Sequence, residues 1–257
     1  MSVRLEIDGP IAHLLIDRPE KRNAFNLAMW EAIPELLERA LETQGVRLLV
    51  LRSSQDEGVF CAGADIKELL ANKDDADWRA ANQAAINRVQ YELTRADLPT
   101  LALIGGDCVG GGCGLALACD LRVAISDKAR FGITPAKLGL VYPMHDVKLL
   151  TDLVGPGQAK RILYTGMLLS AEEALSIGLI EQIAPDPNAL IEAILSASPH
   201  SIRESKKFVR RALDGQSDDD EATLSVFAEA FAGPDFLEGT TAFIEKRAPE
   251  FKASPNS

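Results

Sequence analysis

Glycine and alanine gather at two places where a strand pattern gives way to a helix pattern. The first is Gly110-Gly111-Gly112, which follows an apolar run at residues 101–104. The second is Ala62-Gly63-Ala64, which precedes a helix pattern starting at Asp65. Glycine lets a ligand approach the bare backbone, and the first N–H groups of a helix lack internal partners. We therefore expect these turns to bind an anion, or an oxygen that becomes anionic during a reaction.

The best candidates for donors at these turns are the N–H groups of Ala64 and Gly111. Two such donors that converge on one oxygen would stabilise an enolate or a tetrahedral anion, each by roughly 3–4 kcal/mol. Other catalytic sets are not apparent. His13, His145 and His200 lie in dissimilar contexts, and the chain has no Gly-x-Ser-x-Gly nucleophile turn. The glycine run also lacks the Gly-x-Gly-x-x-Gly spacing that binds dinucleotides.

Strands and helices that would position these turns follow from apolar spacing. Residues 3–7 and 11–16 predict two strands joined at Asp8-Gly9-Pro10, and residues 46–51 predict a strand buried on both faces. Residues 27–43 and 78–95 predict amphipathic helices. Strand patterns stop near residues 195–199 and helix patterns follow. We expect an α/β core over residues 1–197 and a helical C-terminal region over residues 198–257.

Composition limits the kind of partner. The chain of 257 residues has 47% hydrophobic residues and a formal net charge of −11, which argues against a nucleic-acid or anionic-membrane surface. No apolar run is long enough to span a bilayer, and the N-terminus has no signal-peptide pattern. The four cysteines lack Cys-x-x-Cys spacing, so we expect buried thiols, no metal site and a cytoplasmic location.

Five motifs, in order along nearly the whole chain, resemble the enoyl-CoA hydratase/isomerase, or crotonase, superfamily. The resemblance implies a spiral of strand-strand-helix turns with a helical C-terminal trimerisation region, commonly a homotrimer or a hexamer of two trimers. The motifs are Arg18-Pro19-Glu20-Lys21-Arg22-Asn23-Ala24, Phe60-Cys61-Ala62-Gly63-Ala64-Asp65-Ile66-Lys67-Glu68, Gly110-Gly111-Gly112-Cys113, Ala171-x-x-Ala174-x-x-x-Gly178-Leu179 and Ala242-Phe243-x-Glu245-Lys246-Arg247-x-Pro249-x-Phe251.

The same resemblance implies an acyl-CoA substrate and no cofactor beyond its CoA moiety. The thioester carbonyl would lie between the N–H groups of Ala64 and Gly111. The adenosine would lie along residues 62–67, and Phe243 would lie near the CoA of its own or a neighbouring subunit. The residues implied to contact CoA are Lys21, Arg22, Ala62, Gly63, Asp65, Ile66, Lys67, Phe243 and Lys246.

The chain departs from the family pattern at the acid/base positions. Hydratases of the family carry a glutamate directly after Gly-Gly-Gly-Cys, where this chain has Gly114, and a second glutamate where it has Pro135. Hydration needs a base to activate water and an acid to protonate the α-carbon, and neither residue can serve. The dehalogenase branch places an aspartate nucleophile where this chain has Pro143.

One loop resembles the methylmalonyl-CoA decarboxylase branch, which has a tyrosine three residues after a Leu-Gly pair, as Tyr142 stands here after Leu138-Gly139. Loss of CO₂ itself generates the enolate, so this reaction needs an oxyanion hole and a group that orients the carboxylate. Tyr142 is the candidate for that group, although a loop tyrosine can equally serve only to pack its ring. His145 and Asp146 follow closely and could protonate the enolate, or serve as a helix cap.

The leading interpretation is a crotonase-fold enzyme that decarboxylates a malonyl-type acyl-CoA through an enolate. A second is an enoyl-CoA hydratase or isomerase with an acid/base at an unusual position, such as Glu68 or Asp146. A third is a non-catalytic acyl-CoA-binding protein. The candidate catalytic residues are Ala64, Gly111, Tyr142 and His145.

Overall fold

A six-stranded sheet organises the protein, which we describe from a computed structural model over residues 2–251. The strand order is β1-β2-β3-β4-β6-β9. The first two strands are antiparallel, and the other neighbours are parallel. The strands are β1 (Val3–Asp8), β2 (Ile11–Ile16), β3 (Leu48–Ser53), β4 (Thr100–Ile104), β6 (Leu121–Ala124) and β9 (Gln182–Ile183).

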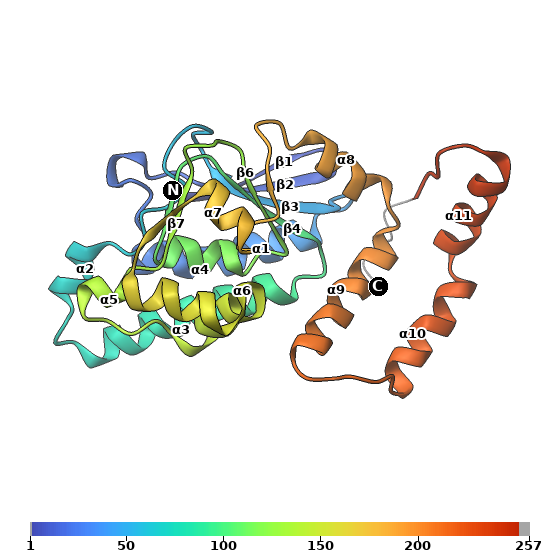
Figure 1. The fold of residues 1–257 in the computed structure, drawn as a ribbon. Coiled ribbons are helices and arrows are strands. Elements are labelled where there is room, and N and C mark those ends of the chain that lie inside the picture. Colours follow the sequence, from blue (N-terminus) through green and yellow to red (C-terminus); the bar gives the residue numbers. More distant parts are fainter. Residues whose placement is uncertain (1, 252–257) are drawn as a thin grey trace.

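A second, three-stranded sheet has the order β5-β7-β8 and lies beside the first (Figure 1). Strand β5 runs parallel to β7, which is antiparallel to β8. Its strands are short, and the turn after β5 leads directly into the helix that begins at Gly111. The strands are β5 (Asp107–Val109), β7 (Arg130–Gly132) and β8 (Leu168–Ser170).

Helices cover both faces of the larger sheet. On one face, side chains such as Leu49 and Leu51 pack in the main core with Trp30 and Ile33 of α1. On the other face, Leu48 and Val50 pack with the smaller cluster that includes residues of α8. The prediction of a strand buried on both faces is therefore confirmed for β3. The helices of this part are α1 (Leu27–Glu42), α2 (Ile66–Ala71), α3 (Ala76–Arg95), α4 (Gly111–Leu117), α5 (Pro135–Leu138), α6 (Met144–Thr165), α7 (Ala171–Ser176) and α8 (Asn188–Ser196), with a 3-10 turn at Pro19–Lys21.

Two prolines and two glycines within residues 131–143 predict an irregular loop, but the structure places the end of β7 and the single-turn helix α5 there. Apolar spacing predicts two helices after it, over residues 146–154 and 157–164. In the structure both belong to one long element, α6, interrupted at Gly155, which has φ 71° and ψ 166°. Glycine adopts this positive φ without a side-chain clash, and Pro156 cannot continue the hydrogen-bond ladder. The Tyr142 loop is thus held between two helices.

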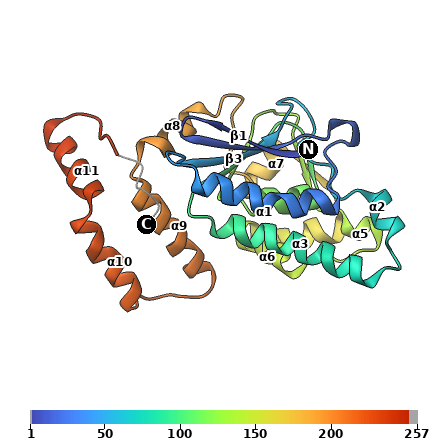
Figure 2. The same ribbon diagram turned by 180° about the vertical axis from the view of Figure 1, so that it is seen from behind.

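A helical C-terminal region follows α8, as expected from the sequence; the exact boundary at residue 197/198 stays a prediction. Figures 1 and 2 show α10 and α11 extending away from the sheet, with α9 between them and the core. The hydroxyl of Ser198 donates a hydrogen bond to Asp235 Oδ2 at 2.6 Å, which ties the start of α9 to α11. The helices are α9 (Pro199–Leu213), α10 (Glu221–Ala232) and α11 (Pro234–Glu245).

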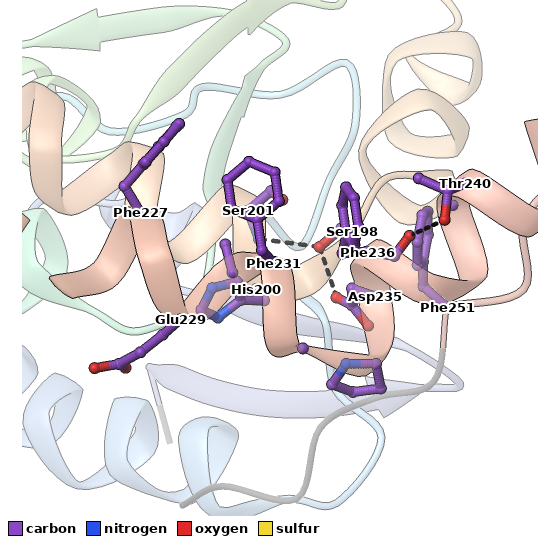
Figure 3. A pocket seen from close by; sticks show the side chains of 14 residues that line it. Ser198, His200, Ser201, Phe227, Glu229, Phe231, Asp235, Phe236, Thr240 and Phe251 are labelled. Atoms are coloured by element: carbon purple, nitrogen blue, oxygen red, sulfur yellow. Dashed lines mark hydrogen bonds between the residues drawn. The ribbon is translucent and has the colours of Figure 1, made fainter. Parts of the chain in front are cut away.

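A cavity of about 460 Å³ lies among these last helices (Figure 3). Phenylalanine rings line it, and Phe231 packs against Phe236 with ring centroids 5.1 Å apart. The cavity is lined by residues 198–251 alone and lies apart from the glycine turns. Within the part of the chain that the structure describes, no helix is both long and apolar enough to cross a membrane.

Candidate active site

The N–H of Ala64 is aimed by the backbone of Phe25. Phe25 donates its N–H to Gly63 O at 2.8 Å, and Asp65 donates its N–H to Phe25 O at 2.7 Å. In this parallel bridge, the groups of residues 63 and 65 face Phe25, so the N–H of Ala64 faces the opposite side. Within residues 2–251 no hydrogen-bond acceptor is assigned to it. The Ala64 N–H is thus free to bind a ligand oxygen.

The N–H of Gly111 comes from the turn into α4. Gly110 has φ 56° and ψ −119°, a conformation that requires glycine, and its own N–H donates to Gly132 O at 2.8 Å. Gly111 is the first helical residue, so its N–H has no intrahelical partner. A β-carbon built on Gly63 would lie 3.7 Å from Gly111 N. The two turns therefore adjoin, and both donors lie at their junction.

The segment 18–24 supports the Ala64 turn. Buried Asn23 donates from Nδ2 to Val59 O at 2.7 Å, and Arg18 forms an ion pair with Asp65 at 3.0 Å. Asp65 also accepts hydrogen bonds from the first N–H groups of α2 and so caps that helix. Burial makes the largest single contribution to the pKa of Asp65 and acts to raise it. Hydrogen bonds and the positive charge of Arg18 together outweigh burial, so the pKa is lowered.

A buried polar cluster lies behind the Gly111 turn. The hydroxyl of Tyr142 donates to Gly110 O at 3.2 Å. Gln90 of α3 donates from Nε2 to Asp146 Oδ1 at 2.5 Å, and its Oε1 lies 3.1 Å from Nδ1 of His145. Asp146 is 1% exposed, and its Oδ2 has no hydrogen-bond partner among the described residues. The cluster brings a carboxyl group and a phenol next to the proposed oxyanion site.

Burial controls the protonation of this cluster. It raises the pKa of Asp146 to about 6, while the hydrogen bond from Gln90 and the nearby hydroxyl of Tyr142 act in the opposite direction. Burial, and next the charge of Asp146, raise the pKa of Tyr142 well above its ordinary value. Burial lowers the pKa of His145, and the cations Arg95, Arg210 and Lys148 add to that effect. Asp146 can therefore gain or lose a proton near neutral pH, whereas Tyr142 stays protonated.

The chain matches a known protein family over nearly its whole length. The family model described as enoyl-CoA hydratase/isomerase matches residues 6–254. The chain belongs to this family. It is 34% identical to a crotonyl-CoA hydratase of Syntrophomonas wolfei over 97% of both chains. It is 32% identical to a short-chain-enoyl-CoA hydratase of Clostridium acetobutylicum, again over 97% of both.

Solved structures agree with the family assignment. A crystal structure of an enoyl-CoA hydratase/isomerase family protein from Hyphomonas neptunium superposes with a TM-score of 0.92 at 38% identity, covering 99% of this chain and 98% of that one. The expected crotonase-type α/β fold is thereby confirmed. An acyl-CoA substrate is what this family leads us to expect.

Residues predicted to contact CoA lie mainly around the Ala64 turn. Lys21 and Lys67 are exposed there. Arg22 also lies there, and it forms an ion pair with Asp107 at 2.7 Å. Phe243, 85% exposed, and Lys246 lie on α11 and just after it, at the far end of the molecule from α2 and α4 (Figures 1 and 2). One chain alone does not bring this second pair to the site.

The remaining acid/base candidates differ in their surroundings. Glu68 accepts a hydrogen bond at 3.0 Å from the N–H of Leu27, the first residue of α1, whose N-cap is Asn26. Pro135 begins α5 and offers no titratable group. A β-carbon on Gly114 would lie 2.3 Å from Asp146 Oδ1, so the carboxyl of Asp146 occupies the space next to the position where we expect the family glutamate. Of the two acid/base candidates, Asp146 thus lies beside α4, and Glu68 lies at the start of α1.

Gln90 was not predicted as a site residue, although its position in an apolar helix pattern could have indicated it. It lies on the inward face of α3 together with Val89 and Leu93, at helical spacing, and is fully buried. A glutamine on an apolar face needs internal hydrogen-bond partners. His145, which was predicted, lies at the outer end of the cluster and contacts Gln90 rather than the oxyanion site.

Proposed function

We propose that this protein decarboxylates a malonyl-type acyl-CoA through a thioester enolate. The observation that carries the proposal is the hydroxyl of Tyr142, which lies 3.2 Å from Gly110 O at the turn that presents the Gly111 N–H. A hydroxyl at this place can rotate to hold a substrate carboxylate out of the thioester plane. That orientation aligns the breaking C–C bond with the π system that accepts its electrons.

The backbone donors would stabilise the charge that develops. As CO₂ leaves, the electron pair of the C–C bond passes to the thioester oxygen, which becomes an enolate oxygen. The N–H groups of Ala64 and Gly111, both without internal acceptors among the described residues, would each contribute roughly 3–4 kcal/mol to that anion. No strong base is required, so Gly114 and Pro135 at the expected glutamate positions do not prevent this reaction. The chain departs from the resembled decarboxylase branch at Gly114, where that branch also has a glutamate.

A second candidate function is hydration or isomerisation of an enoyl-CoA with Asp146 as the acid/base. The buried carboxyl of Asp146, with its pKa raised to about 6, favours this candidate because proton transfer is most efficient when the pKa lies near the working pH. The names of the relatives, crotonyl-CoA hydratase and short-chain-enoyl-CoA hydratase, point the same way.

One assay separates these functions. The purified protein is incubated with malonyl-, methylmalonyl- and ethylmalonyl-CoA, with CO₂ release as the readout, and with crotonyl-CoA, with loss of enoyl absorbance as the readout. We expect CO₂ release from a malonyl-type substrate and negligible hydration. Hydration at a kcat above about 10 s⁻¹, a typical enzyme value, would favour the second candidate. Binding without turnover of any of these thioesters would indicate a non-catalytic acyl-CoA-binding protein.

We further propose a homotrimer, or a hexamer of two trimers, in which α11 of a neighbouring subunit completes the CoA site. Support comes from the apolar side chains that α10 and α11 leave exposed, among them Phe227, Leu237 and Phe243, and from the distance of α11 from α2 in one chain (Figure 1). Sedimentation equilibrium tests the assembly. Weaker CoA-thioester binding by Lys246→Ala, at unchanged mass, is the result expected for a shared site.

A further inference from the structure

The strongest unexplained feature of the interior is the carboxyl of Asp146. It is 1% exposed, Gln90 Nε2 binds its Oδ1 at 2.5 Å, and its Oδ2 has no hydrogen-bond partner among the described residues. No cation among residues 2–251 forms an ion pair with it. A buried carboxyl with an unsatisfied oxygen costs folding free energy, so a purely structural role does not account for it.

Gly114 explains how this carboxyl approaches the reaction site. A β-carbon at residue 114 would lie 2.3 Å from Asp146 Oδ1 and 2.7 Å from Tyr142 Oη. Both oxygens therefore border the same small space, which only glycine leaves open. Tyr142 Oη also reaches the carbonyl of Gly110. The hydroxyl thus stands between the Asp146 carboxyl and the turn that presents the Gly111 N–H.

Resting on the proposed decarboxylation, we propose that Asp146 is the proton source that replaces CO₂ on the α-carbon, acting through the hydroxyl of Tyr142. Once CO₂ has left, the enolate electron pair forms a new bond from the α-carbon to the proton of Tyr142. Tyr142 takes the proton of Asp146 in the same step, and Asp146 remains as a carboxylate. A proton from water then reloads Asp146, so each turnover consumes one substrate carboxylate and one proton.

The charge of the bound substrate favours protonation of Asp146 before CO₂ leaves. A substrate carboxylate held by Tyr142 is a like charge beside Asp146, and it favours the protonated form of that side chain. Asp146 faces the phenol of Tyr142 and neighbours the imidazole of His145. The thiols of Cys113 on α4 and Cys108 on β5 act on Tyr142. The cations Arg95, Arg210 and Lys148 act on His145 at the outer end of the cluster, and no ion pair to Asp146 is found within residues 2–251.

Gln90 and His145 act as positioning residues in this scheme. If Nδ1 of His145 donates to Gln90 Oε1, the amide of Gln90 must turn its NH₂ group toward Asp146. The carboxyl is then held with Oδ1 on Gln90, beside the space that Tyr142 Oη also borders. Since an amide does not relay protons readily, His145 orients the cluster and is not itself the donor.

Two measurements in D₂O test the proposal. In the first, wild-type protein converts methylmalonyl-CoA, and we expect the α-deuterated product with one enantiomer in excess, because the deuteron arrives on the face that CO₂ vacated. In the second, NMR follows exchange of the α-hydrogens of propionyl-CoA, a reaction that needs no decarboxylation. We expect Asp146→Asn to reduce this exchange by at least about 10²-fold and to give racemic product.

Two further variants complete the test, one that interrupts the same relay and one that serves as the control. Tyr142→Phe interrupts the same relay and should lose the exchange and the enantiomeric excess, even if Asp146→Asn fails to fold. Asp152→Asn removes a carboxyl of the same helix, one paired with Lys148 at 2.8 Å, and should behave like wild type. Racemic product from the wild type, or unchanged exchange in Asp146→Asn, would overturn the proposal. Asp146-dependent exchange without CO₂ release would support the proton source while rejecting decarboxylation.

Discussion

A β-carbon on Gly114 would lie 2.3 Å from Oδ1 of Asp146, far inside van der Waals contact. Gly114 belongs to α4 and Asp146 to the first turn of α6, so the contact fixes how these two helices approach each other. A side chain at residue 114 and a carboxyl at residue 146 exclude each other in this packing. The Asp146 cluster therefore requires glycine at residue 114. This glycine does more than replace the glutamate expected there.

Gly114→Ala should destabilise the protein and displace the cluster. The methyl group would overpack the site, at a cost of about 1–3 kcal/mol in the free energy of unfolding. Combining it with Asp146→Ala should relieve the clash, so the two changes together should cost less than their sum by at least about 0.5 kcal/mol. Urea denaturation of the four proteins measures this coupling. Gly157→Ala, where nothing lies within 4 Å of the new β-carbon, is the control and should not destabilise.

Gly111→Pro should remove one oxyanion donor with little change to the fold. Proline is well tolerated at the first position of a helix, which Gly111 occupies, and it has no N–H. We expect kcat/KM to fall by at least about 10²-fold. Gly111→Ala is the control: it keeps the N–H, and its β-carbon would lie 3.3 Å from Cζ2 of Trp30. Near-normal activity of a folded Gly111→Pro protein, checked by circular dichroism, would show that the oxyanion binds elsewhere.

The pH dependence of stability gives an independent view of Asp146. Its pKa is about 6 in the folded protein against 3.8 ordinarily, so the folded state binds the proton more tightly and the free energy of unfolding falls as pH rises from 4 to 6. The carboxylate should cost about 3 kcal/mol above pH 7. Asp146→Asn should then be more stable than wild type at pH 8 by up to that amount and differ by less than about 1 kcal/mol at pH 4. Equal stability at both pH values in urea titrations would contradict a raised pKa.

Much of the fold could be predicted because local patterns determine it. The run Leu48-Leu49-Val50-Leu51 predicts a strand buried on both faces, and the structure confirms it. The free N–H groups of Ala64 and Gly111 could also be predicted, since glycine and the start of a helix identify such groups without any knowledge of distant packing. Their role as oxyanion donors stays a prediction.

The cluster behind Gly111 was harder to predict because it depends on contacts between distant parts of the chain. Gln90, Gly114 and Asp146 come from three helices, and only the packing of α3, α4 and α6 brings them together. Asp146 was one of two candidates for an unusual acid/base, and only the structure separates it from Glu68, which binds the first N–H of α1. Gly155 interrupts α6, so the sequence shows two helix patterns where the structure has one element.

Tyr142→Phe tests the residue on which decarboxylation depends. The change keeps the packing of the ring and removes the hydroxyl, which now donates to Gly110 O at 3.2 Å. A hydrogen bond to a charged group is worth roughly 1.5–3 kcal/mol, so kcat/KM for a malonyl-type thioester should fall by about 10- to 150-fold. The Kd of the plain acyl-CoA should hardly change, because it has no carboxylate to hold. If the ring only packs, Tyr142→Phe will match wild type in both measurements, and Tyr142→Ala will weaken all ligands alike. That pattern would remove the structural basis for decarboxylation and for a proton relay through the Tyr142 hydroxyl, and it would leave direct acid/base chemistry by Asp146 as the alternative.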